Sequence, residues 1–275
     1  EYKKLYGMDI SDIIPEPNSS GAIVIPTTTS VIQSFDGVKS IPQYCFNYRF
    51  RYLTNIKEAH YPDLKTVGSY GLSFAYENCT GLTKITFDAL EEITGNQLQR
   101  VCSECTNLTT AELPMLKRIT STSGMQYAFN ECNLTSFIFS ELEEATGLSY
   151  CFQNNKLLTY LGFPKLREIR SSSSGMSNMV NGCTALEEVE FPALETIQTY
   201  MGASSMFTSS SVKVVRFTKL NDIGRSGCSS MFSSCRTIEH VYFPALTTSS
   251  FGSTYIDQFN GMMSGTATTV THTIH

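Results

Sequence analysis

Residues 82–93 read Leu82-Thr83-Lys84-Ile85-Thr86-Phe87-Asp88-Ala89-Leu90-Glu91-Glu92-Ile93, and they carry apolar side chains at offsets 0, 3, 5, 8 and 11 from the first leucine. The same offsets recur from seven further starting positions: Ile56, Leu108, Leu134, Leu158, Leu186, Val212 and Ile238. The steps between successive starts are 26, 26, 26, 24, 28, 26 and 26 residues. A weaker copy begins near Ser30, and a degenerate one follows from Phe259. The chain is therefore a tandem array with a period of 26 residues.

A period of 26 lies within the range of about 20–29 residues that is typical of leucine-rich repeats. Each such unit is too short to bury its own apolar side, so stacking of neighbouring units supplies the core. Offsets 3 and 5 alternate as in a strand, which places Ile85 and Phe87 inward on a short strand around Lys84–Phe87. Proline follows the offset-5 residue in five copies and is expected to end the strand there, at Pro62, Pro114, Pro164, Pro192 and Pro244. We therefore predict a leucine-rich-repeat solenoid of about nine coils, with stacked parallel strands and little helix.

The limits of the repeat indicate the domain organisation. Residues 1–20 match no repeat, and their Pro15-Glu16-Pro17-Asn18-Ser19-Ser20 segment is typical of an extended linker or tether. Residues 21–275 are expected to form one solenoid domain, with degenerate caps at about 21–50 and 250–275. No apolar run reaches the roughly 18 residues of a membrane-spanning helix, so we expect no direct membrane insertion.

A second motif precedes the first leucine of several copies: an aromatic residue, two further residues and a cysteine. It occurs as Tyr76-Glu77-Asn78-Cys79, Phe129-Asn130-Glu131-Cys132 and Phe232-Ser233-Ser234-Cys235. Together with Cys183-Thr184-Ala185-Leu186 through Phe191-Pro192, this pattern resembles the BspA-like leucine-rich-repeat family over about residues 30–250. Three copies depart from it, with Leu53, Asn155 and Ser209 in place of the cysteine. The resemblance implies a right-handed solenoid on a surface-exposed or secreted protein, usually bacterial, with adhesion or host-protein binding as its role.

The nine cysteines mostly follow the repeat. Cys79, Cys105, Cys132, Cys183 and Cys235 occupy nearly the same repeat position, which predicts a column of small buried thiols. Strands about 4.8 Å apart would allow a disulfide between neighbouring coils, but stacked side chains point in parallel and do not converge. The Cys102-Ser103-Glu104-Cys105 segment has zinc-like spacing, yet no second pair completes four ligands. We expect free thiols, no metal and no cofactor.

Charge and motif content disfavour two classes of function. A net charge of −5 with a pI near 5.4 leaves no basic stripe for nucleic acid or anionic lipid, so we expect neither as a partner. The four histidines lie in no recognisable nucleophile motif. Acidic pairs such as Glu91-Glu92 recur at repeat positions where solvated turns are expected. We therefore expect a protein that is not an enzyme.

The outward side of the stacked strands is the expected recognition surface, because offsets 2 and 4 point away from the core. The last coils are richest there in residue types that anchor partners. The candidate ligand-facing residues are Tyr160, Glu188, Glu190, Arg216, His240 and Tyr242. We expect an extracellular or surface-displayed monomer that recognises a protein or glycan by this surface. The alternative is a structural spacer or assembly module with no ligand of its own.

Overall fold

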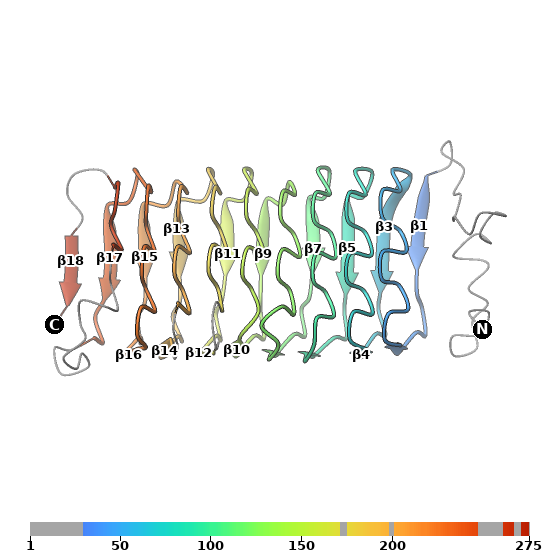
Figure 1. Ribbon diagram of the computed structural model, residues 1–275, viewed down its shortest axis with the longest axis horizontal. Helices are drawn as coiled ribbons and strands as arrows, with labels where there is room; N and C mark the ends of the chain where they lie inside the picture. Colours follow the sequence, from blue (N-terminus) through green and yellow to red (C-terminus); the bar gives the residue numbers. More distant parts are fainter. Residues whose placement is uncertain (1–29, 171–174, 198–200, 247–260, 267–270, 275) are drawn as a thin grey trace.

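The computed structural model describes residues 30–170, 175–197, 201–246, 261–266 and 271–274. It is an elongated stack of coils in which equivalent strands lie side by side along the long axis (Figure 1). The longer strands are β1 (Val31–Ser34), β3 (Ile56–Tyr61), β5 (Lys84–Phe87), β7 (Thr110–Glu112), β9 (Ser136–Ile138), β11 (Tyr160–Gly162), β13 (Glu188–Glu190), β15 (Val214–Arg216), β17 (His240–Phe243) and β18 (Thr271–Ile274). Two-residue strands form a second row: β2 (Ser40–Ile41), β4 (Thr66–Val67), β6 (Glu92–Ile93), β8 (Arg118–Ile119), β10 (Glu144–Ala145), β12 (Glu168–Ile169), β14 (Thr196–Ile197) and β16 (Asp222–Ile223).

This architecture confirms the predicted leucine-rich-repeat solenoid. The structure has about eight complete turns, from β3 to β17, against the nine predicted, with β1 and β18 paired at the two ends. The described residues contain no helix. The linker predicted at residues 1–20 lies outside the described residues, as does most of the cap predicted at 250–275.

Strand register confirms the assignment of inward and outward positions. Ile85 pairs with Ala111 and Val189 pairs with Val215, each one repeat further along the chain. These inward side chains are buried, as are the offset-5 aromatics. We call the outward side of the longer strands the sheet face. Because residues at offsets 2 and 4 align between paired strands, this face carries two columns of outward positions.

The strands end directly before the predicted prolines in β3 and β17 and one residue earlier in β7, β11 and β13, and proline is not the sole cause. β3 ends at Tyr61, directly before Pro62. β5 ends at Phe87, the same repeat position, although Asp88 follows it. The strand therefore ends where the coil bends toward the second row. Proline, which lacks an amide donor, reinforces an end that the bend already determines.

Two interruptions break the ladder of the sheet face. β7 and β9 belong to different sheets, and the spacing from Cys132 to Leu134 is one residue shorter than that from Cys105 to Leu108. β11 and β13 are joined only through Gly162 and Glu190, after the 28-residue step in the repeat. The 28-residue step therefore coincides with weak pairing of β11 and β13, whereas β7 and β9 are one regular 26-residue step apart and differ only in the local Cys132-to-Leu134 spacing.

The cysteine column is buried and its thiols are free, as predicted. The sulfur of Cys79 donates to the Phe50 carbonyl at 2.9 Å, and that of Cys183 donates to the Phe152 carbonyl at 3.1 Å. Asn155 replaces the thiol as donor, since its amide reaches the Phe129 carbonyl at 2.7 Å. The Phe50 and Phe152 carbonyls also accept from the backbone amides of Leu53 and Asn155, so the thiols of the column supply them with a second donor.

One alignment of the cysteine column was wrong. In each coil the column residue directly follows a residue with positive φ, as Cys79 follows Asn78. By that rule Ser210, which follows Ser209, occupies the position, and Ser209 does not. The Ser210 hydroxyl is buried and donates to the Phe207 carbonyl at 2.8 Å.

The remaining side of each coil is a series of turns, which we call the turn face. Residues with positive φ recur there every four positions, as at Tyr44, Tyr48 and Tyr52, with φ of 59°, 58° and 65°. Their amides bond to carbonyls of the next coil, for example from Tyr48 to Ser73 at 3.2 Å. These bonds hold side-chain-bearing residues in a conformation that ordinarily favours glycine. From the sequence we expected a connecting segment on this side of each coil, but not its positive φ values.

Ser205→Gly is expected to raise the free energy of unfolding by about 0.5–1 kcal/mol, because Ser205 has a φ of 53° and glycine removes the clash of its Cβ. Gly182 already has a positive φ at an equivalent turn. Ser229 lies in the next coil without a positive φ, so Ser229→Gly should lower stability by a similar amount. Urea denaturation of both variants checks the pair, and equal effects in both would contradict the role of φ.

Candidate functional site

The structure places all six predicted residues on the sheet face of the carboxy-terminal half. Tyr160 begins β11, Glu188 and Glu190 flank the centre of β13, Arg216 ends β15, and His240 and Tyr242 lie on β17. Ladder partners align them, since Glu190 pairs with Arg216 and Arg216 pairs with Tyr242. Period-2 alternation therefore projects these side chains to one side.

Five of the six residues form one connected row centred on Arg216. Its guanidinium contacts the carboxylate of Glu188 and lies 3.2 Å from that of Glu190. The same guanidinium lies over the Tyr242 ring, 5.3 Å from its centroid, and the Tyr242 and His240 rings are 5.8 Å apart. The row fixes two half-exposed carboxylates on β13 in a defined orientation.

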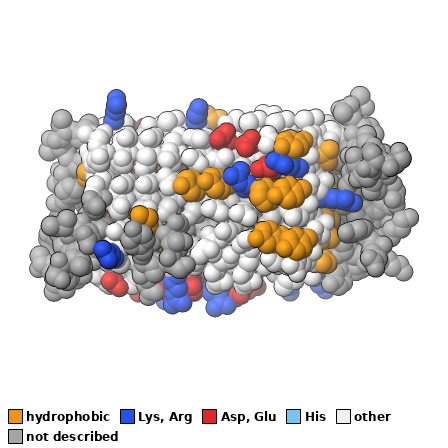
Figure 2. Space-filling model, in the orientation of Figure 1, with side chains coloured by type: hydrophobic (Ala, Val, Ile, Leu, Met, Phe, Trp, Pro, Cys, Tyr) orange, Lys and Arg blue, Asp and Glu red, His pale blue; other side chains and the backbone are white. Residues whose placement is uncertain are grey.

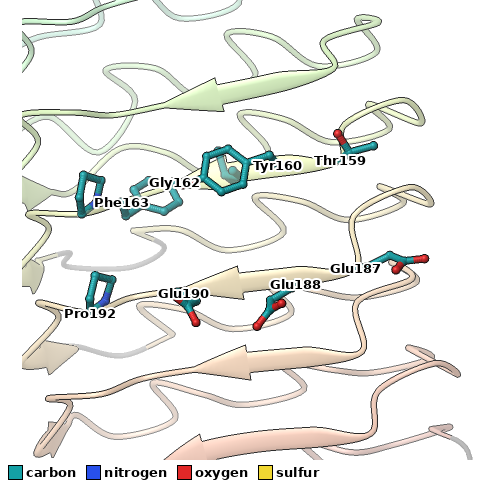
Figure 3. A pocket seen from close by; sticks show the side chains of 10 residues that line it. Thr159, Tyr160, Gly162, Phe163, Glu187, Glu188, Glu190 and Pro192 are labelled. Carbon is teal, nitrogen blue, oxygen red and sulfur yellow. The ribbon is translucent and has the colours of Figure 1, made fainter.

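The sixth residue, Tyr160, faces this row across a hollow between β11 and β13. The hollow has a volume of about 500 Å³. Its lining residues are Thr159, Tyr160, Leu161, Gly162, Phe163, Pro164, Glu187, Glu188, Glu190 and Pro192. Figure 3 shows the Tyr160 ring on one strand and the carboxylates of Glu188 and Glu190 on the next. The hollow coincides with the weakened ladder between these strands.

Gly162 leaves the space that the Tyr160 ring occupies. A Cβ on Gly162 would lie 3.0 Å from the tyrosine oxygen and 3.2 Å from Cε1. The neighbours of Gly162 in its column are Ile138 and Glu190, which both project side chains. The absence of a side chain at Gly162 therefore lets the ring lie along the strand and opens the hollow above it. The sequence placed Gly162 in this column but assigned it no role.

A second hollow of the sheet face lies at the other interruption of the ladder. It has a volume of about 320 Å³ and lies between β7 and β9, where Glu112 and the half-exposed Ile138 contribute to its lining. A third hollow, of about 340 Å³, lies beside β4 and β6, away from the sheet face. None of the six predicted residues lines either of them.

Sequence reasoning missed an aromatic patch on the turn face. Tyr44, Tyr48 and Tyr52 are about half exposed, and Figure 2 shows hydrophobic side chains gathered with basic ones toward the amino-terminal end of the molecule. The Tyr44 and Tyr70 rings stack at 5.3 Å, and the Arg51 guanidinium lies 4.5 Å from the Tyr52 centroid. The four-residue spacing of these tyrosines is the sequence signal that marks the patch.

Two further classes of site are absent from the described ranges. No group of three or more His, Cys, Asp or Glu side chains there is arranged to hold a metal ion. No helix among the described residues is long and apolar enough to span a membrane.

Comparison with known proteins identifies the repeat. The family model described as a BspA type leucine rich repeat region matches in six copies, over residues 26–158, 73–201 and 126–264. No curated protein matches the sequence. Among solved structures, a leucine-rich repeat protein from Bacteroides ovatus is 19% identical with a TM-score of 0.48, and the match covers 75% of this chain. The chain spans about half of that protein, 53% of its length. A leucine rich cell surface protein from Faecalibacterium prausnitzii is 13% identical with a TM-score of 0.25, covering 90% of this chain and 79% of that one.

Proposed function

Since the chain belongs to the BspA-type leucine-rich-repeat family, we propose that it is a surface-displayed or secreted binding protein that recognises a protein or glycan ligand through its sheet face. The binding site is the hollow between β11 and β13, together with the row centred on Arg216. The protein acts by adhesion and carries out no catalysis.

The observation that carries this proposal is the arrangement of Tyr160, Glu188 and Glu190 around a hollow. Tyr160 is 52% exposed, so its ring is accessible to a ligand in the hollow. Tyrosine and arginine are also the residue types that most often anchor partners. The spacer alternative assigns no role to a half-exposed ring beside oriented carboxylates.

The test compares two multiple variants that change opposite sides of the solenoid. The sheet-face variant changes Tyr160, Arg216, His240 and Tyr242 to alanine, and the turn-face variant changes Tyr44, Tyr48 and Tyr52 to alanine. Both are screened with the unaltered protein against immobilised extracellular-matrix proteins and a glycan array. Far-UV circular dichroism and thermal unfolding establish that both variants remain folded.

We expect the sheet-face variant to lose binding and the turn-face variant to retain it. Loss of binding only in the turn-face variant would move recognition to the aromatic patch and contradict the proposal. Absence of binding by the unaltered protein to every probe would favour the spacer alternative.

A further inference from the structure

The Tyr160 ring differs from the stacked tyrosines of the turn face in what covers it. Tyr127 and Tyr150 stack on each other at 4.5 Å, and Tyr48 stacks on Phe74 at the same distance, so these rings cover one another's faces. No ring among the described residues stacks on Tyr160. Its inner side lies on the strand at Gly162, and Figure 3 shows the ring nearly face-on. One aromatic face is therefore open toward the hollow.

An open aromatic face selects for a particular ligand surface. The face of an aromatic ring carries negative charge density and attracts the weakly positive hydrogens of C–H groups. One face of a pyranose ring presents several C–H groups in a nearly flat array, while its hydroxyls point outward. A volume of about 500 Å³ lies within the range of about 300–1,000 Å³ of small-molecule sites. The hollow therefore has room for a sugar unit against the ring.

The polar lining of the hollow consists largely of acceptors. Glu187, Glu188 and Glu190 line it, and an ionised carboxylate can only accept hydrogen bonds. Lys213 already lies 3.0 Å from Glu187, and Arg216 contacts both other carboxylates. These two cations balance most of the negative charge, but each carboxylate keeps lone pairs that they do not use. The carboxylates can therefore accept hydrogen bonds from the hydroxyls of a neutral ligand.

We propose that the hollow between β11 and β13 binds a neutral sugar unit of an oligosaccharide. The C–H face of the sugar packs on Tyr160, and its hydroxyls donate to Glu188 and Glu190. Gly162 is a specificity-determining residue, because a Cβ there would already lie 3.0 Å from the Tyr160 oxygen, and the further carbons of a branched side chain would push the ring from its place on the strand. This inference rests on the proposed function and names its ligand class.

The experiment measures the affinity of the full chain for free oligosaccharides selected on a glycan array, by titration calorimetry. Tyr160→Ala should raise the dissociation constant at least about tenfold. Tyr160→Phe keeps the ring and should raise the dissociation constant less than about threefold. Gly162→Val keeps every polar group and suits a strand, yet it should abolish binding by moving the ring. Tyr52→Ala, at an equally exposed tyrosine of the turn face, is the matched control and should bind normally. Raising the salt concentration should change the affinity little, since the ligand is neutral.

Three outcomes would overturn the inference. Oligosaccharide binding that survives both Tyr160→Ala and Gly162→Val would place the sugar elsewhere. Binding restricted to proteins or basic peptides, lost in the sheet-face variant and weakened by salt, would refute the ligand class while leaving the proposed function intact. Absence of any ligand for the unaltered protein would refute both.

Discussion

Phe191→Ala is expected to lower the free energy of unfolding by about 3–5 kcal/mol. Phe191 is fully buried and stacks between Phe163, at 5.3 Å, and Phe217, at 5.1 Å. Its removal takes away the burial of one ring and leaves a cavity bounded by two others. Because each coil contacts mainly its neighbours, the two adjacent coils lose stability with it.

The measurement is guanidinium denaturation followed by far-UV circular dichroism. Phe191→Leu is the matched control: it keeps most of the apolar volume and should cost clearly less than the alanine variant. A midpoint unchanged by Phe191→Ala would mean that the aromatic column does not hold neighbouring coils together. Unequal slopes of the transition would instead show that the solenoid does not unfold as one unit.

The repeat made most of the fold predictable, because one 12-residue pattern contains both the inward and the outward positions. Once Ile85 and Phe87 are placed inward, the inward positions of all the remaining coils follow from the repeat. The observed pairing of Ile85 with Ala111, one period later, agrees with this assignment. The turn face was not predictable in the same way. Its positive φ values occur at residues as different as Tyr44, Arg100 and Ser205, so no residue type predicts them. Hydrogen bonds between coils, which no local pattern contains, impose that conformation.

The candidate site was predictable in position but not in shape. Offsets 2 and 4 placed Tyr160, Glu188 and Arg216 on one face, and the structure brings them to the same side. The hollow arises from two further features: the 28-residue step that weakens the ladder, and Gly162, whose missing side chain admits a ring. Both are visible in the sequence. Their consequence depends on how the Tyr160 side chain lies, which periodicity does not specify.

The buried thiols should make the protein unusually sensitive to alkali. Burial raises the pKa of the Cys183 thiol to about 12, and it also raises the pKa of the other buried thiols Cys79, Cys102, Cys132, Cys151 and Cys228. In the unfolded chain these thiols ionise near pH 9. Below that pH both states keep their protons and stability is unaffected. Above it the unfolded chain releases protons that the folded chain retains, so stability falls as pH rises.

The expected loss is large because six groups act together. Once the thiols of the unfolded chain are ionised, each buried thiol lowers the free energy of unfolding by about 1 kcal/mol per pH unit. Six such thiols together lower it by several kcal/mol per pH unit. A domain with a stability of about 5–15 kcal/mol should therefore unfold between about pH 9 and 12. Far-UV circular dichroism against pH, with a reductant present, measures the transition.

A matched variant separates thiol ionisation from the loss of surface ion pairs at high pH. Changing Cys79, Cys132 and Cys183, the three of these six thiols that belong to the cysteine column, to alanine should roughly halve the thiols' share of the pH slope. The comparison uses the slope and not the midpoint, because the alanines also reduce packing at neutral pH. An identical slope in both proteins would mean that the thiols titrate normally and that water reaches the column. A halved slope would establish that the cysteine column is a dry part of the core, which explains why another neutral donor, the amide of Asn155, can take its place.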